Sequence, residues 1–362
     1  MKLGCDFMKT ALILFGGVSS EHDVSTVSAR SVIENTPADR YNIILIGITK
    51  DGRWFKYDGD VANLPEDKWL EDKDNLTKAV ISPDREDHGI LVFGENGIEK
   101  IRIDVVFPVL HGKNGEDGTI QGFLQLAGIP YVGCDMLSSA CCMDKAMTNT
   151  LADAAGIPQA KWLGFNKYVY DKSPEMHIKK AEDYLGFPIF VKPANAGSSV
   201  GVTKAVDGES LSKAIDKAFK EDCKIVLEEG IDGMEVECAV LGNDEPIASI
   251  CGEIVPCNDF YDYEAKYVNP SSELHIPARL PQEKIDEVRA AACNAYKALG
   301  CSGLARVDFF VRHSDGKVML NEPNTIPGFT SISMYPKMFA ASGLPYGVLI
   351  DRLLNLAMEK WN

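Results

Sequence analysis

The stretch GLARVDFFVRHSDGKVMLNEPN, residues 303–324, predicts two β-strands joined by a short turn. Because alternate residues of a strand share one face, Arg306 and Asp308 project together from the first strand. Glu322 and Asn324 do the same on the second strand. If the strands pair, two carboxylates and an amide oxygen converge beside a guanidinium group, and oxygen ligands of this type suit magnesium. The alternative interpretation is an exposed polar face on a half-buried hairpin.

Two lysines precede this hairpin in the chain and flank a glycine-rich loop. Lys145 lies near a helix start, and Lys192 follows an apolar strand; the loop ANAGSSVG, 194–201, then joins this strand to the next, as in a flap. Its backbone N–H groups are suited to phosphate oxygens, and Gly197 and Gly201 allow a close approach. A plain hairpin turn with two solvated lysines explains the same residues. Neither G-x-x-x-x-G-K-[ST] nor G-x-G-x-x-G occurs in the sequence.

Three carboxylates follow the next predicted strand, KIVLEE, residues 224–229. Glu228 and Glu229 end this strand, and Glu235 follows a few residues later. The strand end is suited to binding a base edge while Glu235 accepts hydrogen bonds from ribose hydroxyls. Carboxylates at a strand end also commonly face solvent, and this interpretation stays open.

The N-terminal third alternates predicted strands and helices. Strands are expected at 10–15, 42–49 and 104–112, with a helix at 24–34 and another directly after the third strand. This alternation predicts a mostly parallel sheet covered by helices, with hairpins from about 51 to 103. Glu21, Ser25 and His111 follow the ends of two of these strands, where open α/β sheets bind ligands. A histidine at a strand end is also often structural.

The later part of the chain contains further helices and one long polar loop. Helices are expected over about 137–156, 209–219, 282–299 and 336–358. The loop NDFYDYEAKYVNPSSELHIP, residues 258–277, has the character of a lid, from which Lys266 and Tyr267 are placed to reach a bound anion. A plain surface loop is the alternative.

Composition excludes several classes of protein. The net charge of −16 disfavours nucleic acid as a partner, so any anionic ligand requires local cations. Ten cysteines without a C-x-x-C pair indicate free thiols in a reducing cytoplasm rather than a zinc site. The apolar run near the start is too short for a signal peptide, and the uncharged stretch 118–134 is too rich in Gly, Gln and Pro to span a membrane. A chain of 362 residues suggests two or three domains.

Seven motifs, in order along nearly the whole chain, resemble the D-alanine–D-alanine ligase family of the ATP-grasp fold. They are GGVSSEHDVS, LHGKNGEDGTIQG, MDK, VKPANAGSSVG, YDYEAKY, LARVDFF and NEPNTIPGFTS. The resemblance implies three α/β domains: 1–135, substrate-binding with a Rossmann-like parallel sheet; 136–224, central and flap-bearing; and 225–362, catalytic with an antiparallel sheet and the lid 258–277. It also implies a homodimer formed through the N-terminal domain.

The same resemblance implies ATP bound between the central and C-terminal sheets, with two Mg²⁺ ions, or Mn²⁺ in their place. Lys145 and Lys192 would bind phosphates, Glu228 adenine and Glu235 ribose. Where many relatives carry a lysine beside the adenine this chain has Glu229, whose backbone remains as the base contact. The implied nucleotide-binding set also contains Ser199 and Ile231, and the implied metal ligands are Asp308, Glu322 and Asn324.

The implied reaction forms D-alanyl-D-alanine through an acylphosphate, for peptidoglycan precursors and hence the bacterial cell wall. Arg306 and the backbone N–H of Gly328 would hold the tetrahedral oxyanion. The remaining implied residues bind the substrates: Glu21, Ser25 and His111, with Ser198 and Tyr267, at the first D-alanine, and Lys266, Ser333 and Met334 at the second.

Three alternatives remain beside this reading. Relatives that make D-alanyl-D-serine or D-alanyl-D-lactate share LHGKNGEDG and VGCD with this chain, although Met334 and the YEAKY segment favour D-alanine. Another ATP-grasp carboxylate–amine ligase would need a different loop after the first strand. A non-enzymatic ATP-binding protein could dispense with Arg306 or a metal carboxylate, and the chain keeps all of them.

Overall fold

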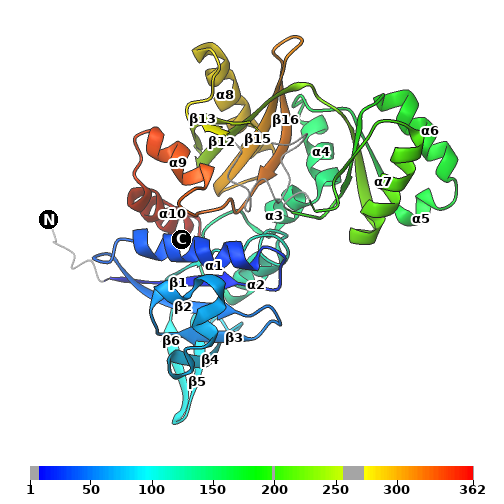
Figure 1. Cartoon of the computed structure of the whole chain (residues 1–362). Coiled ribbons are helices and arrows are strands. Elements are labelled where there is room, and N and C mark those ends of the chain that lie inside the picture. Colours follow the sequence, from blue (N-terminus) through cyan, green and yellow to red (C-terminus); the bar gives the residue numbers. More distant parts are fainter. Residues whose placement is uncertain (1–7, 198–199, 256–272, 362) are drawn as a thin grey trace.

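The computed structural model describes residues 8–197, 200–255 and 273–361. Its strands form three sheets, one in each successive part of the chain (Figure 1). In the same view the N-terminal sheet lies below the other two, and the central sheet lies to one side of the C-terminal sheet. The three-domain ATP-grasp architecture expected from the motifs is therefore present.

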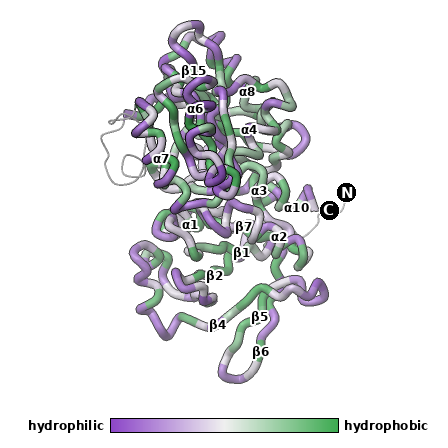
Figure 2. The backbone as a smooth tube through the Cα atoms, turned by 90° about the vertical axis from the view of Figure 1, so that its right-hand side faces the viewer, coloured by the Kyte–Doolittle hydropathy of each residue, from purple (hydrophilic) through white to green (hydrophobic). Residues whose placement is uncertain are grey.

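The first sheet has seven strands in the order β6-β5-β4-β3-β2-β1-β7. Only β7, β1 and β2 are parallel, whereas the other neighbours are antiparallel. The sheet is thus mixed and not mostly parallel, because short connections between about 51 and 103 can join only antiparallel neighbours. Figure 1 and Figure 2 both show β5 and β6 as a hairpin that projects from the molecule. The strands are β1 Lys9–Gly16, β2 Tyr41–Ile48, β3 Trp54–Tyr57, β4 Leu76–Ile81, β5 Gly89–Gly94, β6 Gly97–Arg102 and β7 Val105–Pro108.

Strand β1 is buried on both faces, and its alternate residues enter two different cores. Ala11, Ile13 and Phe15 pack in one core with residues of helices α1 (His22–Asn35) and α10 (Tyr346–Lys360). Leu12 and Leu14 pack on the other face with residues of α2 (Thr119–Ala127). The continuous apolar run that predicted this strand follows from this two-sided burial. Three short 3₁₀ helices, Val61–Asn63, Pro65–Leu70 and Lys73–Asn75, lie between β3 and β4.

The second sheet is antiparallel, in the order β10-β9-β11-β8. Because β11 pairs within it, this sheet extends to Glu229, whereas the sequence predicts an end of the central domain at 224. The helix expected over 137–156 is two helices, since the Asp144 carboxylate accepts the N–H groups of Ala146 and Met147 and starts a new helix. The elements are α3 Met136–Met143, α4 Lys145–Ala154, β8 Trp162–Asn166, α5 Lys167–Tyr170, α6 Pro174–Leu185, β9 Ile189–Pro193, β10 Thr203–Ala205, α7 Gly208–Glu221 and β11 Lys224–Glu229.

The third sheet is also antiparallel, in the order β14-β13-β12-β15-β16. The helix expected over 336–358 is interrupted at Gly343, whose φ is +85°, and at Pro345, so that α9 and α10 are separate. Within the described ranges, no helix is both long enough and apolar enough to cross a bilayer. The remaining elements are β12 Gly233–Gly242, β13 Ile247–Val255, β14 Glu273–His275, α8 Gln282–Ala298, β15 Gly303–Arg312, β16 Val318–Asn324 and α9 Met334–Ala341.

Candidate active site

A cleft of about 1020 Å³ is lined by residues from all three parts of the chain. Ser198, Ser199, Lys266 and Tyr267 lie outside the described residues. Ser25 is the one described candidate that does not line the cleft. The candidates that do are Glu21, His111, Lys145, Lys192, Glu228, Glu229, Ile231, Glu235, Arg306, Asp308, Glu322, Asn324, Gly328, Ser333 and Met334.

The metal-binding candidates lie on the paired strands β15 and β16. Asp308 pairs with Glu322 and Arg306 with Asn324, so the four side chains share one face, as the alternation predicts. Asp308 is buried and its carboxylate accepts hydrogen bonds from Arg306 Nε at 2.8 Å and Nη2 at 2.7 Å. Asn324 Nδ2 donates to the same carboxylate at 2.9 Å. Two carboxylates and an amide form an all-oxygen donor set that fits magnesium.

Glu237 of β12 belongs to the same charged group but was not among the sequence candidates. It is buried, pairs with Asp308 across the strands, and lies with its Oε2 3.1 Å from Arg306 Nε. Arg306 is therefore held between two carboxylates in a fixed orientation. The alternation of Glu235 and Glu237 in GMEVE was the signal that could have identified it.

The two candidate lysines project from the central domain toward these carboxylates. Lys192 Nζ lies 2.6 Å from Glu228, which also accepts a hydrogen bond from Asn149 at 3.2 Å. Burial lowers the pKa of Lys192, but Glu228 and Glu322 raise it more, so its pKa lies above the ordinary value and the ammonium stays charged. Lys145, the first residue of α4, donates to Ala196 O at 2.9 Å and lies 3.7 Å from Glu322. Both cations are thus placed beside the candidate metal ligands.

Glu229, the departure from the relatives' lysine, is engaged by the neighbouring strand. Its Oε1 accepts the backbone N–H of Lys161 at 2.9 Å, and its Oε2 lies 3.9 Å from Lys161 Nζ. The carboxylate therefore holds a cation at this edge of the cleft.

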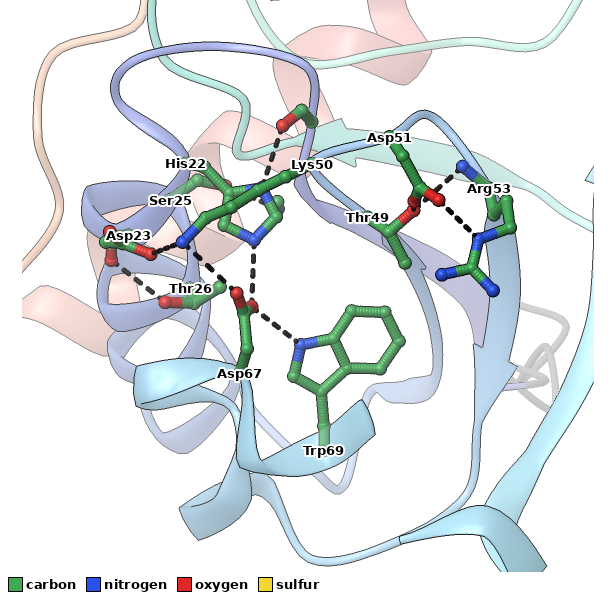
Figure 3. A network of polar contacts seen from close by, with 12 residues as sticks. His22, Asp23, Ser25, Thr26, Thr49, Lys50, Asp51, Arg53, Asp67 and Trp69 are labelled. Carbon is green, nitrogen blue, oxygen red and sulfur yellow. Dashed lines mark hydrogen bonds and ion pairs between the residues drawn. The ribbon is translucent and has the colours of Figure 1, made fainter. Parts of the chain in front are cut away.

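Glu21 is positioned by the network shown in Figure 3, which fixes the start of α1. His22 Nδ1 lies 2.7 Å from Gly17 O and its Nε2 lies 2.8 Å from Asp67 Oδ1. The turn that carries Glu21 is thereby tied to the 3₁₀ segment that contains Asp67. A Cβ atom added to Gly197 would lie only 3.2 Å from Glu21 Oε1, so the glycine-rich loop approaches this carboxylate closely.

His22, Asp23 and Asp67 form the one group of His, Cys, Asp and Glu side chains in the described parts of the chain that is compact enough for a metal ion. Lys50 Nζ already lies 2.7 Å from Asp23 and 3.3 Å from Asp67 (Figure 3). Because the ammonium group already pairs with both carboxylates where a metal ion would bind, we interpret this group as structural.

Gly328, Ser333 and Met334 line the C-terminal wall of the cleft. Ser333 Oγ accepts the N–H of Thr330 at 3.0 Å, and a Cβ atom at Gly328 would lie 2.8 Å from that oxygen. Met334 is buried at the first turn of α9 beside Gly252, where a Cβ atom would lie 2.2 Å from Met334 Cε. Gly328 and Gly252 therefore have no room for a side chain beside Ser333 and Met334.

Ser25 and His111, two of the strand-end candidates, differ in their position. The Ser25 hydroxyl accepts the N–H of Gly16 at 2.8 Å and donates to Val109 O, so it ties the ends of two strands together away from the cleft. His111 lines the cleft, and its Nδ1 lies 2.9 Å from Ile326 O while its Nε2 lies 3.0 Å from Ser28 Oγ. Burial lowers the pKa of His111 to about 4, so the ring is neutral near pH 7.

We expect His111 to make the fold sensitive to acid. The folded-state pKa of His111, about 4, lies below the ordinary 6.5. The unfolded chain therefore binds a proton at a higher pH than the folded chain does, and the unfolding free energy falls as the pH drops from 6.5 toward 4. Between pH 7 and pH 5 the loss in unfolding free energy should be about 2 kcal/mol. Urea unfolding of the wild type and of His111→Gln at both pH values measures it, with the exposed His313→Gln as control. Equal pH dependence in the wild type and His111→Gln would contradict this assignment.

Glu116 is a second cleft residue that was not among the sequence candidates. Its Oε1 accepts the N–H of Gly112 at 2.9 Å and its Oε2 that of Ile326 at 3.1 Å. Removal from water and the neighbouring Glu21 carboxylate raise the pKa of Glu116 to about 8. The acidic pair in GEDG, directly after the third predicted strand, was the signal for it.

Comparisons with known proteins agree with this geometry. Residues 10–134 match the family model "D-ala D-ala ligase N-terminus", and residues 151–355 match "D-ala D-ala ligase C-terminus". The chain is 53% identical to the D-alanine–D-alanine ligase of Caldicellulosiruptor bescii, covering 96% of this chain and 94% of that protein. It is 50% identical to that of Acetivibrio thermocellus, covering 98% of this chain and 97% of the relative.

Two solved structures share the fold over nearly their whole length. The VanG D-Ala:D-Ser ligase from Enterococcus faecalis is 45% identical with a TM-score of 0.89, covering 97% of this chain and 100% of its own. The D-alanine–D-alanine ligase from Coxiella burnetii is 35% identical with a TM-score of 0.85, covering 98% of this chain and 96% of its own. The chain belongs to the D-alanine–D-alanine ligase family.

Proposed function

We propose that this protein joins two D-alanine molecules into D-alanyl-D-alanine at the expense of ATP, for peptidoglycan synthesis. One observation carries the proposal: Lys145, Lys192 and Arg306 line the same cleft as the carboxylates of Asp308 and Glu322, between two antiparallel sheets. In so acidic a chain, this cluster of cations is suited to hold a polyphosphate against the overall field.

ATP would lie between the second and third sheets. Lys145 and Lys192 would bind its phosphates, Glu235 its ribose, and the end of β11 its base, with Ile231 against the ring. Asp308, Glu322 and Asn324 fit two magnesium or manganese ions, which when bound would neutralise the negative charge of the phosphates.

In the first step, a carboxylate oxygen of one D-alanine attacks the γ-phosphorus, and the bond to the β-phosphate oxygen breaks to release ADP. Glu21 would hold the ammonium group of this substrate, and His111 would orient it. The lysines hold the transferring group in line, so the work is positioning and charge stabilisation. The product is an acylphosphate.

In the second step, the amine of the other D-alanine, having lost a proton, attacks the acyl carbon, and phosphate leaves. Arg306 and the N–H of Gly328 would stabilise the oxyanion that forms. Ser333 would bind the carboxylate of this substrate, and Met334 would contact its side chain. Water must be kept from this site, since it hydrolyses an acylphosphate; the predicted lid, 258–277, lies mostly outside the described residues.

The proposal is tested by measuring ADP release and dipeptide formation with ATP, magnesium and one amino acid at a time. D-Alanine should give ADP and dipeptide in equal amounts, and L-alanine should give neither. Absence of turnover with D-alanine would refute the proposed function.

Met334 should make the enzyme select D-alanine over D-serine as the second substrate. A D-Ala:D-Ser ligase is among the similar structures, so D-serine is the second candidate. The buried Met334 offers an apolar contact and no partner for a hydroxyl group. A pocket of this kind discriminates by about a hundredfold at most, so we expect a preference for D-alanine of about tenfold to a hundredfold in kcat/KM. Equal or greater efficiency with D-serine would contradict the role given to Met334.

We further propose that the protein acts as a cytoplasmic homodimer. The described cysteines are free thiols, which fits a reducing compartment. Light scattering of the purified chain would measure its mass, and a monomer at micromolar concentration would refute the dimer.

A further inference from the structure

The segment Ile326–Phe329, which carries the proposed oxyanion donor Gly328, is held by side chains from the N-terminal part of the chain. His111 Nδ1 lies 2.9 Å from the carbonyl oxygen of Ile326, and the N–H of Ile326 donates to Glu116 at 3.1 Å. Both backbone groups of one residue are therefore bound from the other side of the cleft.

Ser28 extends this network to the far end of the segment. Its Oγ accepts the N–H of Phe329 at 3.3 Å and lies 3.0 Å from His111 Nε2. The directions are mutually consistent when His111 carries its proton on Nδ1: the ring donates to Ile326 O and accepts from the Ser28 hydroxyl. Ser28, His111, Ile326 and Phe329 are all buried, so loss of one bond leaves its partner without water to replace it.

Glu116 differs from His111 and Ser28 because the two oxygens of its carboxyl group bind backbone N–H groups of two different loops. Oε1 binds the N–H of Gly112, in the loop after β7, and Oε2 binds the N–H of Ile326, in the loop after β16. Each of its two oxygens can accept one of these bonds, in the protonated acid as well as in the carboxylate, whereas an amide in its place offers one acceptor and turns an N–H group toward the other donor. The neighbouring Asp117 also binds two N–H groups, but these belong to Asn114 in its own loop and to Thr119 at the start of α2, and neither lies in the segment Ile326–Phe329.

We infer that Glu116 is a positioning residue which, with His111 and Ser28, sets the Gly328 N–H for the second step of the reaction. The inference rests on the proposed function, in which Gly328 stabilises the oxyanion. Such a donor contributes only if it is fixed before charge develops, because a displacement of about 1 Å can cost about a hundredfold in rate. Phosphoryl transfer, in which Gly328 has no part, should be little affected.

The test compares Glu116→Gln with the matched control Asp117→Asn. For Glu116→Gln we expect kcat for dipeptide formation to fall by about tenfold to a hundredfold, with the KM for ATP within about twofold of the wild type. We also expect more ADP than dipeptide, because the acylphosphate persists and is hydrolysed. Asp117→Asn should keep the ratio of one ADP to one dipeptide, since Asp117 binds Asn114 and Thr119 and makes no bond to the segment Ile326–Phe329.

The wild type tests the proposed function, and the variants test the positioning role of Glu116. A wild type that makes no dipeptide refutes the function before any variant is considered. If the wild type is active and Glu116→Gln keeps the wild-type kcat and ratio, or if Asp117→Asn raises the ratio equally, the positioning role is wrong. Circular dichroism checks folding, and if Glu116→Gln does not fold, Ser28→Ala decides the matter: an unchanged ADP-to-dipeptide ratio in it overturns the inference.

Discussion

Glu322→Gln is expected to lower ADP release with ATP, magnesium and D-alanine by about a thousandfold or more, while the fold remains intact. Glu322 lies opposite Asp308 in the register of β15 and β16 and 3.7 Å from Lys145. The substitution keeps the shape of the side chain but removes the charge that would bind magnesium, and phosphoryl transfer depends on that charge compensation. A coupled assay of ADP release measures the loss.

The control for this variant is Asp315→Asn, in the turn of the same hairpin. Asp315 binds the exposed Arg312 and does not line the cleft. It should retain wild-type turnover, and circular dichroism should show both variants folded. Near-normal ADP release by Glu322→Gln would refute its assignment as a metal ligand.

Arg306→Lys is expected to reduce dipeptide formation by about a hundredfold to a thousandfold, although it conserves the positive charge. Arg306 binds Asp308 through two nitrogens and also lies 3.1 Å from Glu237. A lysine ammonium cannot reproduce this two-point geometry, so the cation leaves the place where the oxyanion develops. Single-turnover formation of dipeptide is the measurement.

Arg312→Lys is the matched control, because Arg312 lies on the same strand and binds Asp315 in the same two-point manner outside the cleft. Its activity should stay within about twofold of the wild type, since exposed ion pairs contribute little. Equal losses in the two variants would indicate damage to β15 instead of a catalytic role for Arg306.

Local pattern was sufficient to predict the centre of the site. The alternation in LARVDFF and LNEPN depends on strand geometry alone, and the structure pairs Asp308 with Glu322 as that alternation predicts. The apolar run of β1 is equally local, because a strand buried on both faces needs apolar residues at every position. Roles assigned to these residues remain predictions until the variants are measured.

Local sequence patterns are insufficient where contacts between residues far apart in the chain decide the position of a side chain. Ser25, like Glu21, follows the first predicted strand. Its hydroxyl, however, is hydrogen-bonded to the backbone of Gly16 and Val109, and no local sequence pattern reveals these two bonds. Glu116 owes its importance to Ile326, more than two hundred residues later in the chain. The mixed character of the first sheet follows from connection lengths, which outweighed the helix–strand alternation on which the prediction relied.

Helix α10 comes from the last residues of the chain but packs into the core beneath β1, where Leu349 and Leu353 join Ile13. Tyr41 of β2 adds a hydrogen bond to Asp351 at 2.9 Å. The central sheet, by contrast, has a core of its own built wholly from residues 163–227. The first and third sheets thus share a core, whereas the central sheet is joined to the third through α4, whose Ala152 packs in the core of that sheet. A rotation of the central sheet during nucleotide exchange should accordingly carry residues 163–227 and leave α4 packed on the third sheet.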